Sequence, residues 1–268
     1  MAALTVLTWN LFHGRDHPPA DSPTHAEVNR VLRDEFADLL AREPWDVAFL
    51  QEAPPHWLRP IARRAGAHGA SALTSRNLGA FARRRLAELN PDLIASNEGG
   101  SNQVLVRGGW GIAETRRLTL TLLPERRRLL WVRLAHPDHG EVTAANLHAT
   151  AGDRPGAERD VLKAARAACA WSAATPLVFG GDLNMRMTES PGAFALLERD
   201  LGLTGALPGR AIDHLLARRL QVLEAPRALT PDRREVSVTE GQVRLSDHAA
   251  VVAAYALGSA ATTSRRGE

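Results

Sequence analysis

Apolar runs that end in polar residues recur along the chain. Residues 4–11 are rich in β-branched and aromatic side chains and lead into His13-Gly14-Arg15, which predicts a strand followed by a loop. Residues 46–50 form an apolar run between prolines, as is typical of a strand buried on both faces. Asn10 lies near the end of the first strand, and Glu52 lies just past the second. Further strands are expected at residues 103–107, 118–122, 129–135, 142–147, 176–179, 212–216, 221–225 and 249–257.

Other segments carry apolar residues at helical spacing. Residues 23–42 interleave apolar and charged positions as an amphipathic helix does, and residues 159–171 predict an alanine-rich helix. Two shorter, arginine-rich helices are expected at residues 57–65 and 78–89. Strands and helices interleaved along 268 residues favour one α/β domain over residues 1–257, and the polar residues 258–268 are expected to be disordered.

The composition is that of a soluble globular protein, since 44% of the residues are hydrophobic and 24% are charged. The formal net charge is +3, and Lys163 is the only lysine, so almost every cation is an arginine. Arginine binds phosphate oxygens in a bidentate manner, but a compositional bias explains the same count. We interpret the arginine clusters at 83–85 and 126–128 as solvated faces, with a nucleic-acid track as the alternative.

Cys169 is the only cysteine, which excludes an internal disulfide and a thiolate metal cluster and fits a reducing compartment. The N-terminal residues have neither the basic leader nor the cleavage site of a signal peptide. No apolar run approaches the roughly 20 residues needed to span a bilayer. We therefore expect a cytoplasmic protein, and a monomer.

The polar residues at the predicted strand ends are those that phosphoester hydrolysis requires. This reaction needs a cation to offset phosphoryl charge, a group that activates water, and donors for the transition state. Carboxylates and amides are hard oxygen ligands, which favour magnesium, calcium or manganese over zinc. The carboxylates are Glu52, Asp182 and Asp247, the amides are Asn10 and Asn184, and the histidines able to move protons are His148 and His248.

Six short motifs follow one another, each at a predicted strand end. They are Thr8-Trp9-Asn10-Leu11, Leu50-Gln51-Glu52, Asn146-Leu147-His148, Gly181-Asp182-Leu183-Asn184, Ile212-Asp213-His214 and Ser246-Asp247-His248. In this order they resemble the endonuclease/exonuclease/phosphatase superfamily, and the resemblance covers nearly the whole chain. One such motif is a weak signal, whereas six in order are a specific one.

The resemblance implies a four-layer α/β/β/α sandwich, in which two packed mixed β-sheets are flanked by helices and the site lies at one edge of the sheets. It also implies that Glu52 binds the metal directly, with Asn10 and Asp247 close to it and partly connected through water. The cofactor implied is Mg²⁺, with Mn²⁺ or Ca²⁺ as alternatives.

The resemblance implies catalytic roles as well. Asp182 would orient or deprotonate the attacking water, and Asn184 would donate a hydrogen bond to the scissile phosphate. His248 would contact a phosphoryl oxygen and be oriented by Asp213, as in other carboxylate–histidine pairs.

His148 indicates the branch of the superfamily. Apurinic-site endonucleases have a tyrosine in the central region, whereas the only tyrosine here is Tyr255, in the last predicted strand. A histidine after the Asn-Leu strand is similar instead to pancreatic-type deoxyribonucleases and sphingomyelinase-like phosphodiesterases, where it assists the leaving group. Residues 101–107 loosely resemble a family strand that would turn Asn102 toward the substrate phosphate. We interpret His214 as structural, and His13, His136 and His139 as surface residues.

The sequence therefore predicts a metal-dependent phosphoester hydrolase. The preferred hypothesis is a phosphodiesterase or nuclease, acting as an endonuclease or exonuclease on DNA or RNA. The alternative is a phosphatase or phosphodiesterase acting on a small molecule or a lipid headgroup. An inactive binding module is a minor alternative, because such a protein is expected to have lost a metal carboxylate or the final histidine.

Overall fold

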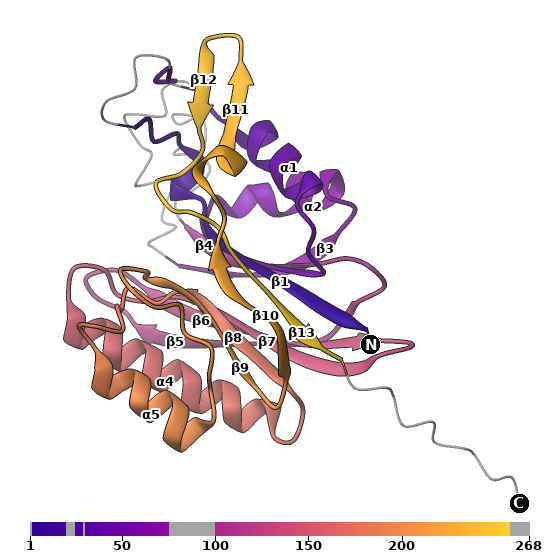
Figure 1. The fold of residues 1–268 in the computed structure, drawn as a ribbon, viewed down its shortest axis with the longest axis vertical. Coiled ribbons are helices and arrows are strands. Elements are labelled where there is room, and N and C mark those ends of the chain that lie inside the picture. The colour runs from indigo at the N-terminus through magenta and orange to yellow at the C-terminus, as the bar shows by residue number, and fades with distance from the viewer. Residues whose placement is uncertain (1, 20–24, 29, 75–99, 258–268) are drawn as a thin grey trace, which may run out of the picture.

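Two β-sheets packed face to face form the centre of the molecule in the computed structural model, which describes residues 2–19, 25–28, 30–74 and 100–257 (Figure 1). The first sheet has the strand order β10-β13-β1-β2-β4-β3, and the second has the order β5-β6-β7-β8-β9. The strands of the first sheet are β1 (Ala3–Asn10), β2 (Val47–Ala53), β3 (His68–Leu73), β4 (Ser101–Val106), β10 (Gln221–Ala228) and β13 (Val251–Ala256). Those of the second are β5 (Gly111–Thr121), β6 (Arg127–His136), β7 (Gly140–His148), β8 (Leu177–Asp182) and β9 (Asp213–Arg218).

Helices cover the outer face of each sheet. The elements outside the two sheets are α1 (Arg33–Arg42), α2 (Leu58–Arg64), α4 (Arg154–Ser172), α5 (Pro191–Leu201), the hairpin β11 (Glu235–Val238) and β12 (Gly241–Arg244), and the 3-10 turns η1 (Phe12–Gly14), η2 (Pro55–Trp57) and η4 (Pro231–Arg234). Helices α1 and α2 lie on the first sheet, and α4 and α5 lie on the second (Figure 1). Among the described residues, no helix is long and apolar enough to cross a membrane.

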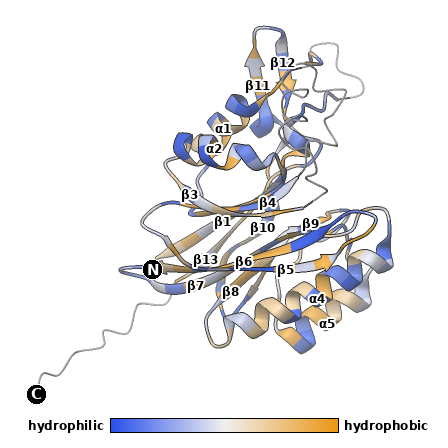
Figure 2. Cartoon of the chain, turned by 180° about the vertical axis from the view of Figure 1, so that it is seen from behind, coloured by the Kyte–Doolittle hydropathy of each residue, from blue (hydrophilic) through white to orange (hydrophobic). Residues whose placement is uncertain are grey.

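Three hydrophobic cores separate the four layers. Trp9 and Phe36 belong to the core between the first sheet and its helices, and their ring centroids are 5.0 Å apart. Phe49 belongs to the core between the two sheets, and Trp131 and Phe179 belong to the core under α4 and α5. Figure 2 shows hydrophobic residues concentrated on the strands of both sheets. The predicted four-layer α/β/β/α sandwich is confirmed.

Among the described strands, each sheet contains one parallel pair, β1 with β2 and β7 with β8, while the other paired strands are antiparallel. Both sheets are therefore mixed, as predicted. The carboxyl ends of parallel neighbours lie at the same sheet edge, so Asn10 lies beside Gln51 and His148 lies beside Asp182. Packing the two sheets together then brings four strand ends to one place.

The helix predicted for residues 23–42 is wrong over its first half. The helix α1 begins only at Arg33, and residues 25–28 and 30–32 are not helical. The amide of Ala26 donates to the carbonyl of Gln242 (2.8 Å), and that of Val28 donates to the carboxylate of Asp16 (3.0 Å). These backbone groups have partners in β12 and in the loop after β1, which takes the place of helical hydrogen bonds. Residues 23, 24 and 29, the predicted helix at 78–89 and the tail at 258–268 lie outside the described residues.

Candidate active site

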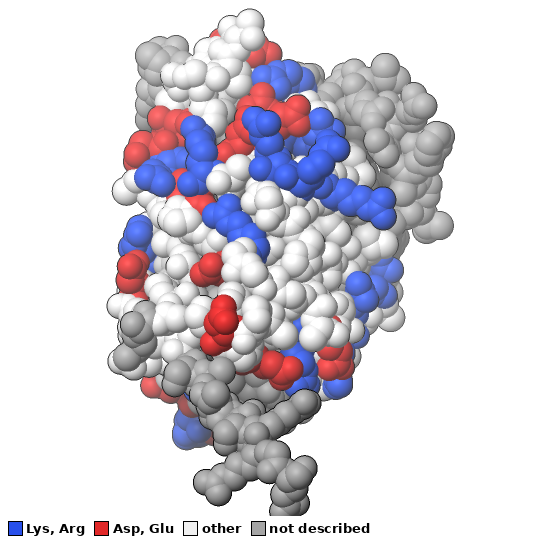
Figure 3. All heavy atoms as spheres, turned by 90° about the vertical axis from the view of Figure 1, so that its right-hand side faces the viewer, with Lys and Arg blue, Asp and Glu red and all other residues white. Residues whose placement is uncertain are grey.

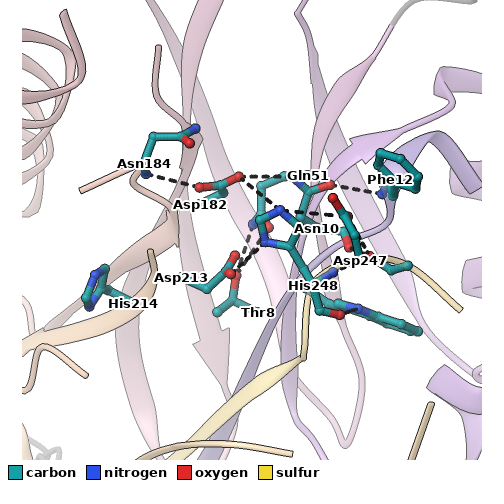
Figure 4. Close-up of polar contacts among 12 residues, drawn as sticks. Thr8, Asn10, Phe12, Gln51, Asp182, Asn184, Asp213, His214, Asp247 and His248 are labelled. Atoms are coloured by element: carbon teal, nitrogen blue, oxygen red, sulfur yellow. Dashed lines mark hydrogen bonds and ion pairs between the residues drawn. The ribbon is translucent and has the colours of Figure 1, made fainter. Parts of the chain in front are cut away.

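The site lies where the ends of β1 and β8 meet across the two sheets. The Asn10 side-chain nitrogen donates to Asp182 Oδ2 at 3.0 Å, and both residues are buried (Figure 4). The Asn10 side-chain oxygen accepts from the backbone amide of Phe12 at 2.9 Å. Asn10 therefore connects the two sheets and also holds the turn that follows its own strand.

Behind this contact, a buried polar bridge fixes the two sheets relative to each other. Gln51 Nε2 donates to Asn146 Oδ1 at 2.7 Å and to Thr8 Oγ1 at 3.0 Å. Asn146 Nδ2 donates in turn to the carbonyls of Leu50 (3.0 Å) and Gln103 (2.8 Å). Gln51 immediately precedes Glu52, and Asn146 lies two residues before His148. The bridge therefore sets the separation of those two predicted site residues.

Gly180 and Gly181 allow β8 to approach its neighbours. A Cβ on Gly181 would lie 2.0 Å from the carbonyl oxygen of Leu147, and its φ of +125° is strongly unfavourable for other residues. A Cβ on Gly180 would lie 2.1 Å from the carbonyl oxygen of His214. The glycines before Asp182 are therefore required by packing, and they bring that carboxylate into contact with the residues of β7 and β9.

Asp182 is a buried carboxylate surrounded by donors. Its Oδ1 accepts from the backbone amide of Asn184 at 3.0 Å, and its Oδ2 lies 3.4 Å from His148 Nε2. Burial, reinforced by the negative charge of Asp213, raises its pKa to about 7. Asn184 adopts a positive φ of 50°, and its side-chain nitrogen donates to the carbonyl of Ala149 at 3.2 Å. A carboxyl group that changes charge near neutral pH is well suited to accept a proton from water.

His248 and Asp213 form the pair that the sequence predicts. His248 Nδ1 donates to Asp213 Oδ2 at 2.7 Å, and its Nε2 lies 3.9 Å from Asp182 Oδ2 and 3.8 Å from Asp247 Oδ1. Burial alone lowers the pKa of His248, but the hydrogen bond and charge of Asp213, with the charges of Asp182 and Asp247, outweigh it and raise the pKa to about 10. His248 is therefore an imidazolium at neutral pH, with Nε2–H directed among the carboxylates (Figure 4).

Ser246 anchors the loop that carries Asp247 and His248. Its hydroxyl donates to the carbonyl of Asn10 at 2.7 Å and accepts from the amide of His248 at 3.0 Å, and its φ is +61°. Arg234, which is partly buried, donates to the carbonyls of Ser246 and His248. The last motif is thereby attached to the end of β1, more than 230 residues earlier in the chain.

Glu52 lies at the irregular end of β2 and has an unexpected neighbour. Its φ is +49°, and the strand pairing shifts register between Leu50 and Ala53. His13 Nε2 lies 3.1 Å from Glu52 Oε2, and His148 Nδ1 lies 3.7 Å from Glu52 Oε1. The prediction that His13 is a surface residue is therefore wrong. His13 lies in the 3-10 turn η1 after β1, and a histidine in a turn has no signature of its own in the sequence.

The donor set fits a divalent cation. The nearest ligand atoms of Asp182, Asp213 and His248 all lie within 4.8 Å of one another. Asp213 Oδ1 is buried and has no hydrogen-bond partner among the described residues. Because His248 is protonated, the oxygens of Asp182 and Asp213 are the ligands in this group, and such carboxylate oxygens are those that magnesium, manganese or calcium prefer. Glu52 lies on the other side of the His148 ring from Asp182. The crowding of carboxylates also raises the electrostatic free energy of the empty site, which a cation would lower.

Two further predicted residues have other surroundings. His214 is buried, its Nε2–H donates to the carbonyl of Met185 at 2.9 Å, and its Nδ1 accepts from the amide of Leu207 at 3.1 Å, in agreement with a structural role. Asn102 donates from its side-chain nitrogen to the carbonyl of Arg128 at 2.7 Å, and its side-chain oxygen has no partner among the described residues. Contact between Asn102 and a substrate phosphate stays a prediction.

Arg127 contacts the site although the sequence predicts a solvated cluster at 126–128. Only 6% of Arg127 is exposed, and its Nη1 lies 2.9 Å from His148 Nδ1. Burial, followed by the charges of Arg127, His248 and His13, holds the pKa of His148 well below its ordinary value. A charged residue next to a turn gives no sign in the sequence that it will be buried, so this contact was missed.

A pocket of about 270 Å³ opens beside the carboxylates, and its lining includes Asp213, Asp247 and His248. Leu207 and Ile212 give it an apolar wall. A group attached to a phosphate held at His248 would have room there.

The sequence model of the Endonuclease/Exonuclease/phosphatase family matches residues 7–248, and the chain belongs to this family. Members of the family are phosphoester hydrolases and generally depend on a divalent metal. No curated protein matches the sequence significantly.

Several solved structures share the fold. A family protein from Beutenbergia cavernae has 20% identity and a TM-score of 0.67, with 96% of this chain and 72% of that chain covered. A mannosyl-6-phosphatase from Bacteroides thetaiotaomicron has 16% identity and a TM-score of 0.65, with 95% and 100% covered. The human Nocturnin catalytic domain with bound sulfate has 18% identity and a TM-score of 0.64, with 96% and 95% covered. At these identities the likeness concerns the fold alone.

Proposed function

We propose that this site hydrolyses a phosphoester by attack of water, with Mg²⁺ as the cofactor and Mn²⁺ or Ca²⁺ as alternatives. The observation that carries the proposal is the arrangement of Asp182, with a pKa of about 7, beside the Asp213–His248 pair, with a histidine pKa of about 10. One group thus accepts a proton near neutral pH while the other carries a positive charge. The two groups lie less than 4 Å apart. A base that activates water and a cationic donor that stabilises the phosphoryl oxygens are the groups that phosphoryl transfer requires.

The residues take the following roles in this proposal. Glu52, with Asn10 and Asp247, holds the cation, which offsets charge on the phosphoryl oxygens when it is bound. Asp182 orients and deprotonates the attacking water, and it is itself held by Asn10. The Nε2–H of His248 donates to a phosphoryl oxygen, and this donation strengthens as negative charge develops there.

The remaining roles concern substrate orientation. Asn184 donates a hydrogen bond to the scissile phosphate from the edge of the site, where its backbone is fixed by Asp182. Asp213 keeps the His248 ring oriented and protonated. Because all of the predicted catalytic and metal-binding side chains are retained, an inactive binding module is disfavoured.

The described arginines favour a small phosphoester over a long nucleic acid. A nuclease needs a basic surface that neutralises several phosphates. Many arginines are instead paired with acids, and Figure 3 shows arginines lying among acidic side chains on one face. The pairs include Arg30–Glu35, Arg33–Asp34, Arg64–Asp38, Arg133–Glu141, Arg186–Glu189, Arg199–Asp200, Arg233–Glu43 and Arg244–Glu235. We therefore place a small phosphoester first and the nuclease, endo- or exonucleolytic on DNA or RNA, second. A cytoplasmic location belongs to the same proposal and is supported by the buried free Cys169.

A substrate panel with Mg²⁺, Mn²⁺ and chelator tests the function. Release of phosphate or alcohol from small phosphomonoesters and phosphodiesters is compared with plasmid nicking and with digestion of single-stranded RNA. His248→Ala should lower kcat on the best substrate by on the order of a hundredfold or more, by analogy with the removal of other transition-state donors. Asp213→Asn should cost less, and the double variant should be far from multiplicative because both act through one ring. Turnover that persists in chelator, or effects that simply multiply, would contradict the proposal.

A further inference from the structure

His148 has a different partner on each side of its ring. Arg127 Nη1 lies 2.9 Å from Nδ1, and Glu52 Oε1 lies 3.7 Å from the same nitrogen. On the other side, Asp182 Oδ2 lies 3.4 Å from Nε2. An arginine and a carboxylate thus compete for Nδ1. A guanidinium donates a hydrogen bond and needs an unprotonated Nδ1, whereas a carboxylate accepts one and needs a protonated Nδ1.

The position of the ring proton follows from this chemistry. A guanidinium has five N–H donors and no acceptor, so a hydrogen bond to Arg127 requires Nδ1 to be unprotonated. The proton of the imidazole then resides on Nε2 and is directed to Asp182. The 2.9 Å contact with Arg127 is a hydrogen bond, whereas the 3.7 Å separation from Glu52 is too long for one.

We propose that Arg127 is a positioning residue that fixes His148 as its Nε2–H tautomer and prevents His148 from pairing with Glu52. Two consequences follow. His148 acts as a hydrogen-bond donor toward Asp182 or the phosphate, and does not deliver a proton to a leaving group as the resemblance to deoxyribonucleases suggests. Glu52 Oε1 stays unpaired with His148, so it remains available to a cation. The second consequence rests on the proposed function, whereas the tautomer does not.

The surroundings of Arg127 keep it in this position. It begins β6, whose pairing with β7 aligns Leu129 with Leu147 and thereby places the start of β6 beside the end of β7. Glu125 Oε2 lies 2.7 Å from Arg127 Nη2, so the guanidinium is held from both ends. The side chain is 7% exposed, and a buried cation without these two partners would be strongly unfavourable.

Long-range ¹H–¹⁵N correlation spectra of histidine-labelled, metal-free protein test the tautomer directly. A His148→Gln variant identifies the His148 signals among those of the 10 histidines. We expect Nδ1 to resonate in the range of an unprotonated acceptor nitrogen and Nε2 in the range of a protonated one. Arg127→Met removes the donor while keeping an apolar chain of similar length, so His148 Nδ1 should gain a proton and pair with Glu52. A protonated Nδ1 in the unmodified protein would overturn the proposal even if no variant folds.

The matched control is Arg126→Met, because Arg126 donates to the carbonyl of Thr74 rather than to His148. This variant should leave the His148 spectrum unchanged. Mn²⁺ affinity, measured by calorimetry, should fall about tenfold or more in Arg127→Met and stay unchanged in Arg126→Met. An unaltered His148 spectrum in a folded Arg127→Met protein would refute the role of Arg127. A changed tautomer with unchanged Mn²⁺ affinity would refute the link to Glu52, and absence of Mn²⁺ binding in all proteins would contradict the proposed function while leaving the tautomer result intact.

Discussion

Burial and neighbouring charges together set the protonation of single residues in this site. Burial is the larger cause of the raised pKa of Asp182, whereas at His248 the hydrogen bond to Asp213 and the neighbouring negative charges outweigh burial. Asp213 and Asp182 are both buried carboxylates, but a histidine lies against Asp213 at 2.7 Å, while amides and a neutral histidine surround Asp182. The two groups therefore act differently, although they are the same residue type. In the proposed function Asp182 is the proton acceptor, because the cationic His248 lies 3.9 Å from it and is not hydrogen-bonded to it, and Asp213 is the orienting group, because His248 Nδ1 donates to it at 2.7 Å.

The pH dependence of turnover should report the Asp213–His248 pair. His248 has a folded-state pKa of about 10, above its ordinary 6.5. Its stabilising contribution is thus fully present below pH 6.5 and is lost as the pH rises through about 10. If protonated His248 is required, kcat should fall along an alkaline limb near that pH. Asp213→Asn removes a negative partner, so the limb should move to lower pH. A pH profile of kcat for both proteins measures this, and an alkaline limb in the same place in both would contradict the pairing.

At the scale of elements, glycine packing controls where the carboxylate of Asp182 lies. Gly181 is the residue before Asp182 in β8, and the backbone of β7 fills the space that a side chain would need. Gly181→Ala should destabilise the protein by about 2–5 kcal/mol, because the new methyl group must displace backbone and occupy an unfavourable φ. Gly192→Ala in α5 is the control, since a Cβ there meets nothing within 4 Å. Urea unfolding of both variants compares them, and equal stabilities would show that β8 can shift freely.

The sequence predicted the elements whose apolar pattern is strong and failed where local pattern is weak. Strands β1, β2 and β8 are apolar runs with polar ends, and they were found with the site residues that follow them. Strand β3 is half exposed at a sheet edge and rich in small residues, so its sequence carries little alternation. The β11–β12 hairpin and α5 were missed as well. The helix predicted before Arg33 was wrong because the backbone of that segment bonds outside it, with Ala26 donating to the distant Gln242 and Val28 donating to Asp16.

The same limit applies within the site. Motifs at strand ends identified Asp182, Asp213 and His248, because parallel pairing aligns the end of β8 with that of β7, while antiparallel pairing aligns the start of β9 with the end of β8 and the start of β13 with the end of β1. His13 and Arg127 lie next to these motifs but have no signature of their own, since a histidine in a turn and an arginine in a cluster are ordinary surface residues. Only the packing of the two sheets shows that they contact Glu52 and His148.

At the scale of the whole molecule, charged and polar groups of the site join the two sheets and the loop that precedes β13. Asn10 comes from the first sheet and Asp182 comes from the second. Ser246 attaches the last loop to Asn10, and His248 attaches the same loop to Asp213 of the second sheet. A cation that binds here would therefore connect three parts of the fold. Its binding energy should appear as stability of the whole molecule, because a ligand that binds only the folded state stabilises it by mass action.

Thermal unfolding with increasing Mg²⁺ or Mn²⁺ should show this connection. At about a hundred times Kd, the free energy of unfolding should increase by about 2.7 kcal/mol, which raises Tm by several degrees. Glu52→Gln keeps the size of the side chain but removes the charge, so it should unfold at a similar temperature without metal and lose most of the metal-dependent increase. Glu141→Gln is the control, because Glu141 is a partly exposed carboxylate that pairs with Arg133 and lies at the opposite end of β7 from His148. Equal metal-dependent increases in the free energy of unfolding of all three proteins would mean that the cation binds elsewhere and that Glu52 is not its ligand.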